Sequence, residues 1–317
     1  MKVFLTGAAG FIGYHSAKSL LDDGYEVHGY DSVNDYYDPY YKQIRLNKLN
    51  EYKNFTFTRG LLEDHATLAR VYKSFAPTHV LHLAAQAGVR YSIENPHAYI
   101  ISNIVGFQNI IELVRNTPQI DNFVYASSSS VYGGNKTYPF SEDQAVNNPI
   151  SLYAATKISN ELVAKTYQHL YKIPSTGLRF FTVYGPYGRP DMALFLFTKK
   201  ILDHVEIPVF NQGNMTRDFT YVDDIVKGIR AALHKPQPYA IYNLARGKQE
   251  SLFQMIEILE QNLDRKADKK LLPMQAGDVE MTAADISKAE RELGYKPSVS
   301  IEEGIPNFVK WYLSVHS

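Results

Sequence analysis

Short apolar runs alternate with stretches of helical periodicity through the first part of the chain. The runs near residues 3–5, 26–30, 55–58, 79–83, 123–126 and 175–181 have the length and composition of buried strands. Apolar residues recur at helical spacing near residues 11–21, 64–75, 96–115 and 149–171. Strands separated by helices pair in parallel through right-handed crossovers. The pattern therefore predicts an α/β fold with a doubly wound parallel sheet.

The composition changes after residue 183. Glycine, proline and asparagine are scattered through residues 184–220, helical patterns dominate, and apolar runs become short. We expect residues 1–183 to form one large domain and residues 184–317 to form mainly a second, smaller α/β domain, with some C-terminal segments returning to the first. No internal repeat or low-complexity segment interrupts this division.

Charge and cysteine content exclude several classes of function. The 317 residues include 33 Lys and Arg and 33 Asp and Glu, so no net charge attracts nucleic acid or an anionic membrane. Cysteine is absent, which excludes disulfides, thiolate nucleophiles and cysteine-based metal sites. The N-terminus has no signal-peptide pattern, and no run of about 18 apolar residues follows it. We expect a soluble cytoplasmic protein without a bound metal.

A glycine turn follows the first predicted strand. Gly7, Gly10 and Gly13 form a G-x-x-G-x-x-G pattern, which lets backbone N–H groups and a helix N-terminus approach a pyrophosphate. Asp31 ends the second strand, about where dinucleotide-binding folds place the acid that holds the adenosine ribose. Because a carboxylate repels a 2′-phosphate, the pattern favours NAD over NADP.

Two further strands end in small or hydroxylated residues. Leu83, Ala84 and Ala85 would let a flat cofactor lie against the backbone, although small residues at a strand end also permit tight packing. Serines fill residues 127–130 after the next strand, at the carboxyl edge of the sheet where ligands of open α/β folds bind. Their hydroxyls can hydrogen-bond a substrate alcohol or carboxylate.

One predicted helix carries a phenol and an ammonium four residues apart. Tyr153 and Lys157 therefore share a face of this helix. The ordinary pKa of tyrosine is near ~10, and a fixed cation nearby favours the phenolate, which can take a proton from an alcohol. In a chain with 24 tyrosines, however, a surface pair is the commoner meaning of this spacing taken alone.

The order of these motifs resembles that of a known family. The glycine turn, Asp31, residues 83–85, the serines and Tyr153-x-x-x-Lys157 occur as in the extended short-chain dehydrogenase/reductases. Three stretches, at residues 34–38, 86–92 and 179–192, resemble the UDP-glucuronate 4-epimerase group of NAD-dependent nucleotide-sugar epimerases. The resemblance covers essentially the whole chain. It implies a Rossmann-type NAD-binding domain followed by a UDP-sugar-binding domain.

The resemblance also implies a mechanism in which tightly bound NAD is restored at each turnover. Tyr153 would take the proton of the sugar 4-hydroxyl, Lys157 would lower the pKa of Tyr153 and hold the nicotinamide ribose, and Ser128 would bond the reacting oxygen. A transient 4-keto sugar would then receive the hydride on its other face. The cofactor-binding residues implied, besides Tyr153 and Lys157, are Gly7, Gly10, Phe11, Ile12, Gly13, Asp31, Asp64, Leu83, Ala84, Ala85 and Asn103.

Substrate recognition is implied in the same way. Arg217 would bind the diphosphate, Asp278 the uridine ribose and Phe210 the uracil ring. Arg189 would meet the sugar carboxylate, because an arginine offers a planar fork to a carboxylate. The substrate-binding residues implied are Arg90, Ser128, Ser129, Ser130, Thr182, Arg189, Phe210, Arg217 and Asp278. The helices near residues 92–115 and 149–171 would pair two copies of the chain in a homodimer.

Ser129 and Ser130 distinguish this chain from related families with other activities, and Leu61 departs from the usual sequence of the family. Related 4,6-dehydratases carry an Asp-Glu pair where this chain has Ser129 and Ser130, and related uronate decarboxylases keep the Glu. Leu61 stands where the family usually has an aspartate for the adenine amino group, so that contact is expected to pass to the backbone. The alternatives are a neutral UDP-hexose or UDP-pentose 4-epimerase, a UDP-glucuronate decarboxylase or dehydratase, and a non-catalytic NAD-binding regulatory protein.

Overall fold

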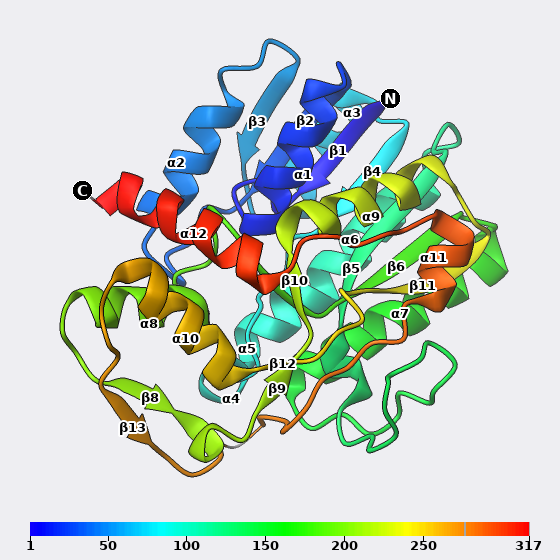
Figure 1. Cartoon of the computed structure of the whole chain (residues 1–317). Helices are drawn as coiled ribbons and strands as arrows, with labels where there is room; N and C mark the ends of the chain where they lie inside the picture. Colours follow the sequence, from blue (N-terminus) through cyan, green and yellow to red (C-terminus); the bar gives the residue numbers. More distant parts are fainter. Residues whose placement is uncertain (276, 317) are drawn as a thin grey trace.

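The computed structural model describes residues 1–275 and 277–316 of the chain (Figure 1). Its strands are β1 (Lys2–Thr6), β2 (Glu26–Asp31), β3 (Phe55–Arg59), β4 (His79–His82), β5 (Asn122–Ser128), β6 (Ser175–Phe180), β7 (Thr182–Tyr184), β8 (Ile207–Val209), β9 (Thr216–Arg217), β10 (Phe219–Tyr221), β11 (Tyr239–Leu244), β12 (Glu250–Ser251) and β13 (Lys269–Leu271). Within the described residues, seven of them form one parallel sheet in the order β11-β6-β5-β4-β1-β2-β3. All six strands predicted before residue 183 lie in this sheet, and the predicted fold class is confirmed.

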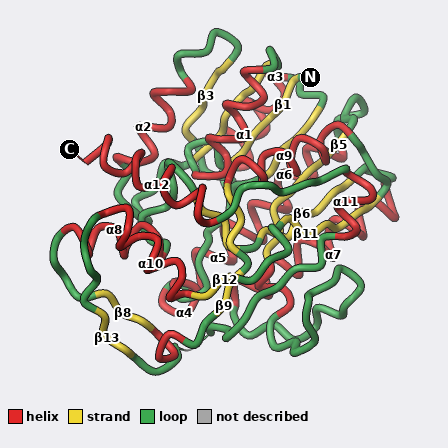
Figure 2. The backbone as a smooth tube through the Cα atoms, in the orientation of Figure 1, coloured by secondary structure: helices red, strands yellow, loops and turns green. Residues whose placement is uncertain are grey.

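Helices cover both faces of this sheet (Figure 2). On one face Val3 and Leu5 of β1 pack in a core with α1 (Phe11–Asp22), α9 (Val222–His234) and α11 (Ser287–Leu293). On the other face Phe4 packs in a core with α3 (His65–Phe75), α6 (Gly106–Arg115) and α7 (Leu152–Tyr171). Alternate residues of one strand thus enter opposite cores, which is why the strands read as continuous apolar runs.

Residues after 183 contribute to more than one core. β11 was not predicted, and it extends the central sheet by pairing in parallel with β6, while α9 packs against α1. In contrast, α8 (Ala193–Leu202), α10 (Leu252–Leu263) and α12 (Ile301–His316) enclose a separate core around Phe308 and Trp311. Three small two-stranded sheets, β10-β7, β12-β9 and β13-β8, lie alongside. The division into two domains at residue 183 stays a prediction.

The helix predicted over residues 96–115 consists of three segments. They are α5 (Pro96–Tyr99), the π-helical segment η1 (Ile100–Val105) and α6. A π-helical turn is wider than an α-turn and is often found at functional sites. The remaining helical elements are α2 (Tyr40–Leu49), α4 (Tyr91–Glu94), and the 3₁₀ turns η2 (Ser129–Tyr132) and η3 (Phe210–Gly213). α4 lies at the start of the helical region predicted near residues 92–115, whereas α2 was not predicted.

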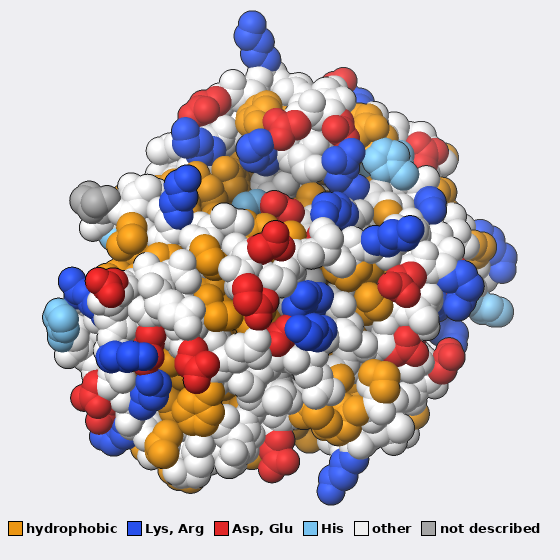
Figure 3. Space-filling view, in the orientation of Figure 1, with side chains coloured by type: hydrophobic (Ala, Val, Ile, Leu, Met, Phe, Trp, Pro, Cys, Tyr) orange, Lys and Arg blue, Asp and Glu red, His pale blue; other side chains and the backbone are white. Residues whose placement is uncertain are grey.

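Among the helices that the structure describes, none is long and apolar enough to cross a bilayer. Basic and acidic side chains are interspersed over the face shown in Figure 3.

Buried His82 makes the stability of the fold depend on pH. Its Nδ1 lies 2.8 Å from Thr6 Oγ1, and burial lowers its pKa to about 3, with a smaller effect of the Lys157 charge. Between pH 3 and about 6.5 the unfolded chain therefore binds a proton that the folded chain does not. The free energy of unfolding should fall by about 2 kcal/mol between pH 7 and pH 5 through this residue. His82→Gln should remove that part of the pH dependence in urea titrations.

Exposed His169 provides the control for this titration. His169→Gln should leave the pH dependence as it is. An unchanged slope in His82→Gln would show that protonation of His82 does not contribute to acid destabilisation.

Candidate functional site

A cavity of about 670 Å³ opens at the carboxyl ends of β1, β2, β4 and β5. This is the edge at which open α/β sheets bind their ligands. Thirteen of the predicted site residues line it, which brings the cofactor motifs and the predicted catalytic residues into one space. They are Gly7, Gly10, Phe11, Ile12, Gly13, Asp31, Leu83, Ala84, Ala85, Ser128, Tyr153, Lys157 and Arg189.

The glycine turn between β1 and α1 has no room for side chains. A Cβ atom on Gly13 would lie 1.9 Å from the carbonyl oxygen of Gly7, and one on Gly7 would lie 2.7 Å from the backbone nitrogen of Ala84. Gly7 also has a positive φ of 78°, which glycine adopts readily. The close packing of the turn on Ala84 explains why small residues follow β4.

Asp31 holds the loops on either side of it. Its Oδ2 accepts a hydrogen bond of 3.0 Å from the backbone N–H of Ala9, and its Oδ1 accepts one of 2.8 Å from Val33. Burial raises the pKa of Asp31, while these donors and the Lys42 ammonium oppose that effect. The carboxylate lines the cavity with further lone pairs able to accept from ribose hydroxyls.

Tyr153 and Lys157 lie on the first turns of α7, which begins at a Ser151 cap. The Lys157 ammonium donates a hydrogen bond of 2.9 Å to the Ala126 carbonyl oxygen at the end of β5. Burial lowers the pKa of Lys157 to about 8, while the Glu161 charge raises it. A buried ammonium at this position lines the cavity beside the serines of β5.

The predicted lowering of the Tyr153 pKa by Lys157 stays a prediction. Burial raises the pKa of Tyr153, and the opposing effects come from hydrogen bonding with Ser128 and from the Arg189 charge. Ser128 and Arg189 are therefore close enough to influence Tyr153, and all three residues line the cavity.

The four serines do not share one environment. Ser127 donates a hydrogen bond of 2.6 Å to Glu161, which forms a buried ion pair of 2.7 Å with Arg179. Ser128 accepts from the backbone N–H of Ser130 at 3.1 Å and lines the cavity. Residues 129–130 begin η2 and do not line the cavity.

Two predicted cofactor residues lie outside the cavity. Asp64 caps α3 by accepting from the backbone N–H of Thr67 at 3.1 Å. Asn103 is buried in η1, and its side-chain amide bonds the backbone N–H and carbonyl oxygen of Gln86 at 2.8 and 3.0 Å. Asn103 thus supports a residue that lines the cavity. Leu61 also lines the cavity, but its carbonyl oxygen already accepts from the Tyr30 hydroxyl.

Four predicted substrate residues form a second cluster. Arg90 donates to Asp278 at 2.8 Å, and its guanidinium lies 5.1 Å from the centre of the Phe210 ring. Burial lowers the pKa of Arg217, while the Asp278 charge raises it, which places those two groups near each other. Thr182 lies on β7, where its backbone N–H donates a hydrogen bond of 3.2 Å to the carbonyl oxygen of Asp218, and it does not line the cavity.

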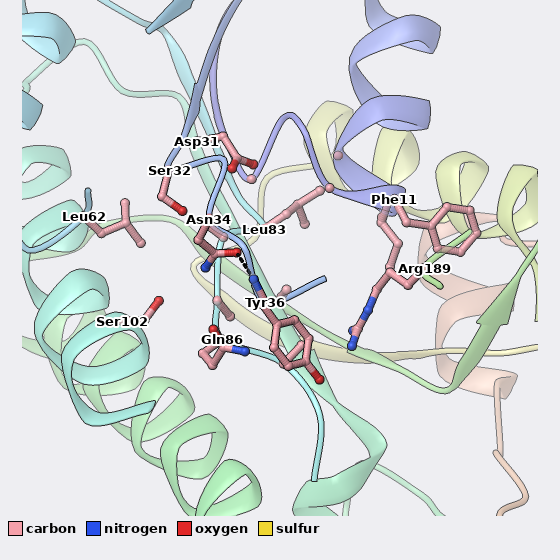
Figure 4. Close-up of a pocket in the computed structure, with 18 of the residues that line it drawn as sticks. Phe11, Asp31, Ser32, Asn34, Tyr36, Leu62, Leu83, Gln86, Ser102 and Arg189 are labelled. Atoms are coloured by element: carbon pink, nitrogen blue, oxygen red, sulfur yellow. Dashed lines mark hydrogen bonds between the residues drawn. The ribbon is translucent and has the colours of Figure 1, made fainter. Parts of the chain in front are cut away.

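Several residues at the site were not predicted. Tyr36, Lys42 and Gln86 line the cavity, and Figure 4 shows Tyr36 and Gln86 there. Asp191 does not line the cavity but contacts Arg189. Tyr36, Gln86 and Asp191 belong to the stretches that carried the family resemblance, which was the available signal for them. No role had been assigned to them, because their residue types alone indicate no chemistry.

Buried Arg45 links the two sides of the site. It donates 2.9 Å bonds to the Ala9 carbonyl oxygen in the glycine turn and to the Tyr37 hydroxyl. It also donates to the carbonyl oxygens of Tyr187 and Gly188, just before Arg189. This arginine on α2 therefore joins the glycine turn to the loop that carries Arg189.

The cavity fits a dinucleotide. The crowded glycine turn presents backbone, Asp31 offers acceptors for ribose hydroxyls, and Gln86 Nε2 is buried without a hydrogen-bond partner in the described part of the chain. A buried amide of this kind is expected to bond a ligand or water. Within residues 1–275 and 277–316, no cluster of three histidine, aspartate or glutamate side chains is placed to hold a metal ion.

Comparison with known proteins decides the family. The sequence profile of the GDP-mannose 4,6 dehydratase family matches residues 4–308. The chain belongs to this family. The predicted resemblance to the nucleotide-sugar epimerases is confirmed by this match and by the relatives of the chain.

Several relatives of this member of the GDP-mannose 4,6 dehydratase family are named UDP-glucuronate 4-epimerases. It is 47% identical to UDP-glucuronate 4-epimerase 4 of Arabidopsis thaliana over 99% of this chain and 76% of that protein. It is 44% identical to a probable UDP-glucuronate 4-epimerase of Rhizobium meliloti over 98% and 97% of the two chains. The crystal structure of UDP-glucuronic acid 4-epimerase from Bacillus cereus, in complex with UDP-glucuronic acid and NAD, matches with a TM-score of 0.94 at 35% identity and covers 99% and 100% of the two chains.

Proposed function

We propose that the chain is an NAD-dependent 4-epimerase that interconverts UDP-glucuronate and UDP-galacturonate through a 4-keto intermediate. The observation that carries this proposal is the meeting of Tyr153, Ser128 and Arg189 in the cavity lined by the glycine turn and Asp31. A base, a hydroxyl and a guanidinium then surround one sugar, beside a dinucleotide site. Relatives that are UDP-glucuronate 4-epimerases, one of them solved with NAD, support the choice of substrate and cofactor.

Bound NAD supplies an acceptor and donor of hydride at the sugar C4. Tyr153 takes the proton of the 4-hydroxyl and returns it after the sugar has turned over. The same oxygen is an alcohol, then a ketone, then an alcohol again, so one group working in both directions is sufficient. Ser128 hydrogen-bonds that oxygen, and Lys157 binds the nicotinamide ribose.

The protein must also bind the sugar carboxylate in a way that prevents its loss as carbon dioxide. A ketone next to the carbon that bears a carboxylate loses carbon dioxide readily. Ser129 and Ser130 stand where related dehydratases carry an Asp-Glu pair and where related uronate decarboxylases keep the Glu, so the chain has neither carboxylate. We assign Arg189, with Thr182, to holding the carboxylate where the breaking bond does not overlap the carbonyl. At the other end of the substrate, Arg217, Asp278 and Phe210 bind the UDP group.

Arg189→Ala should reduce the use of acidic substrates more than that of neutral ones. A charge-assisted hydrogen bond contributes about 1.5–3 kcal/mol, so kcat/KM for UDP-glucuronate should fall by about 10- to 100-fold relative to UDP-glucose. Steady-state kinetics with both sugars measure this ratio. Arg115→Ala, which removes an exposed pair with Glu112, is the matched control. Equal losses for both sugars would assign Arg189 to loop structure.

We further propose that the chain is a cytoplasmic homodimer that supplies a sugar nucleotide for polysaccharide biosynthesis. Leu162 and Leu170 lie two turns apart on one side of α7 and are 60% and 58% exposed. Val105, at the junction with α6, is also exposed. Burial of such apolar side chains between two copies is favourable. Sedimentation velocity should show a dimer that Leu162→Glu with Leu170→Glu dissociates.

A further inference from the structure

Arg189 is held by two other side chains. Its Nε donates a hydrogen bond of 3.0 Å to Asp191 Oδ1, and its Nη2 donates to Asp191 Oδ2. Tyr36 donates its hydroxyl to the same Oδ2 at 3.1 Å, and the Arg189 guanidinium lies 5.9 Å from the centre of the Tyr36 ring. We call these residues the Arg189–Asp191–Tyr36 unit.

The unit bridges the cofactor and substrate sides of the cavity. Tyr36 belongs to the loop after β2, a few residues beyond Asp31, whereas Arg189 and Asp191 belong to the loop between β7 and α8. Tyr36 and Arg189 both line the cavity, and Figure 4 shows Arg189 extended toward Tyr36. Tyr36 is itself fixed, since its ring packs against Tyr91 with 4.8 Å between centres.

Asp191 leaves one end of the guanidinium free. An arginine has five N–H donors in a planar fork. Asp191 takes one donor from Nε and one from Nη2. The two donors of Nη1 and the second donor of Nη2 remain at the end of the fork. That end can accept a second carboxylate in a bidentate arrangement.

We propose that Asp191 is a positioning residue that determines the preference for acidic sugars, by orienting the free end of Arg189 toward the sugar carboxylate. Tyr36 contributes by fixing Asp191. This inference rests on the proposed function, in which Arg189 binds that carboxylate. An arginine side chain without such a partner samples many rotamers, and ordering it on binding reduces affinity.

The negative charge of Asp191 also offsets the positive charge of Arg189. This charge effect weakens the attraction of Arg189 for a sugar carboxylate and so opposes the orienting effect of Asp191. The Arg189 and Asp191 side chains are 22% and 27% exposed, so solvent screens this charge effect only in part. Orientation of the fork is a matter of geometry and is not screened. Loss of Asp191 should therefore weaken the preference for an acidic sugar.

The test compares the dissociation constants of UDP-glucuronate and UDP-glucose by calorimetry on the NAD-containing Tyr153→Phe protein, which should bind the sugars without turning them over. Asp191→Asn should lower the preference for UDP-glucuronate by about tenfold, the value of one charge-assisted hydrogen bond. Tyr36→Phe should lower it in the same direction by a smaller factor. Asp203→Asn, which removes an exposed pair with Lys199, should leave it unchanged. A preference that is unchanged or raised in Asp191→Asn would overturn the proposal, as would an equal loss for both sugars.

A double variant separates this proposal from the proposed function. If Asp191 acts through Arg189, Asp191→Asn should have no further effect on the preference in an Arg189→Ala background. Additive effects would overturn the positioning role. If Arg189→Ala alone leaves the preference unchanged, the carboxylate role of Arg189 fails and the positioning role fails with it. If Arg189→Ala removes the preference and Asp191→Asn does not change it, only the positioning role fails.

Discussion

Tyr153→Phe should lower the turnover of UDP-glucuronate by about 10²- to 10⁴-fold and leave binding of the UDP-sugar nearly unchanged. The substitution removes one oxygen atom and keeps the ring, which packs edge-on against Tyr99. The fold of α7 should therefore be retained. The loss should appear in kcat, because the phenolic oxygen transfers a proton in the reaction and contributes little to holding the UDP group. Steady-state kinetics and calorimetry measure the two quantities separately.

Tyr171→Phe provides the matched control, since Tyr171 is an exposed tyrosine at the other end of the same helix. It should have wild-type kinetics. Substantial activity in Tyr153→Phe would remove Tyr153 from the mechanism. A parallel loss of substrate binding would instead indicate that the hydroxyl helps to hold the sugar.

Gly13→Ala should abolish NAD retention. The added Cβ atom would lie 1.9 Å from the Gly7 carbonyl oxygen, so the first turn of α1 must move away from the glycine turn. Overpacking of this kind costs about 1–3 kcal/mol of stability. The larger effect should fall on the cofactor, because the shifted backbone no longer places its N–H groups around a pyrophosphate. The nucleotide released from purified protein by heat, measured by chromatography, should fall from about one per chain to almost none.

Lys18→Ala tests whether a change elsewhere on α1 has the same effect. Lys18 forms an exposed pair with Asp22, so its removal should cost little stability and leave NAD bound. Normal NAD content in Gly13→Ala would show that the glycine turn does not form the cofactor site.

The sheet and the cofactor motifs were predictable because they depend on local sequence. Each of the first five strands is a short apolar run with a helical segment after it, and the glycine turn lies between β1 and α1. β11 is also an apolar run, but it returns to the central sheet only because α9 packs beside α1. That placement depends on contacts distant in sequence. α2 has few apolar residues, so periodicity could not predict it.

The site residues also fall into those that local sequence could predict and those that depend on contacts distant in sequence. Residue types with their own chemistry, such as Tyr153, Ser128 and Asp31, could be proposed from spacing and order. The hydrogen bond from the Lys157 ammonium to the Ala126 carbonyl oxygen could not be predicted, since these residues lie 31 positions apart. Asp191 could not be assigned at all, because its contact with Tyr36 spans 155 positions.

The most direct test of the account is to incubate the purified protein with UDP-glucuronate and no added NAD, and to follow the sugar nucleotides and carbon dioxide. A 4-epimerase with bound NAD should form UDP-galacturonate until the two uronates reach equilibrium, and it should release no carbon dioxide, because bound NAD is restored at each turnover. UDP-pentose as the main product, or turnover of UDP-glucose alone, would contradict it.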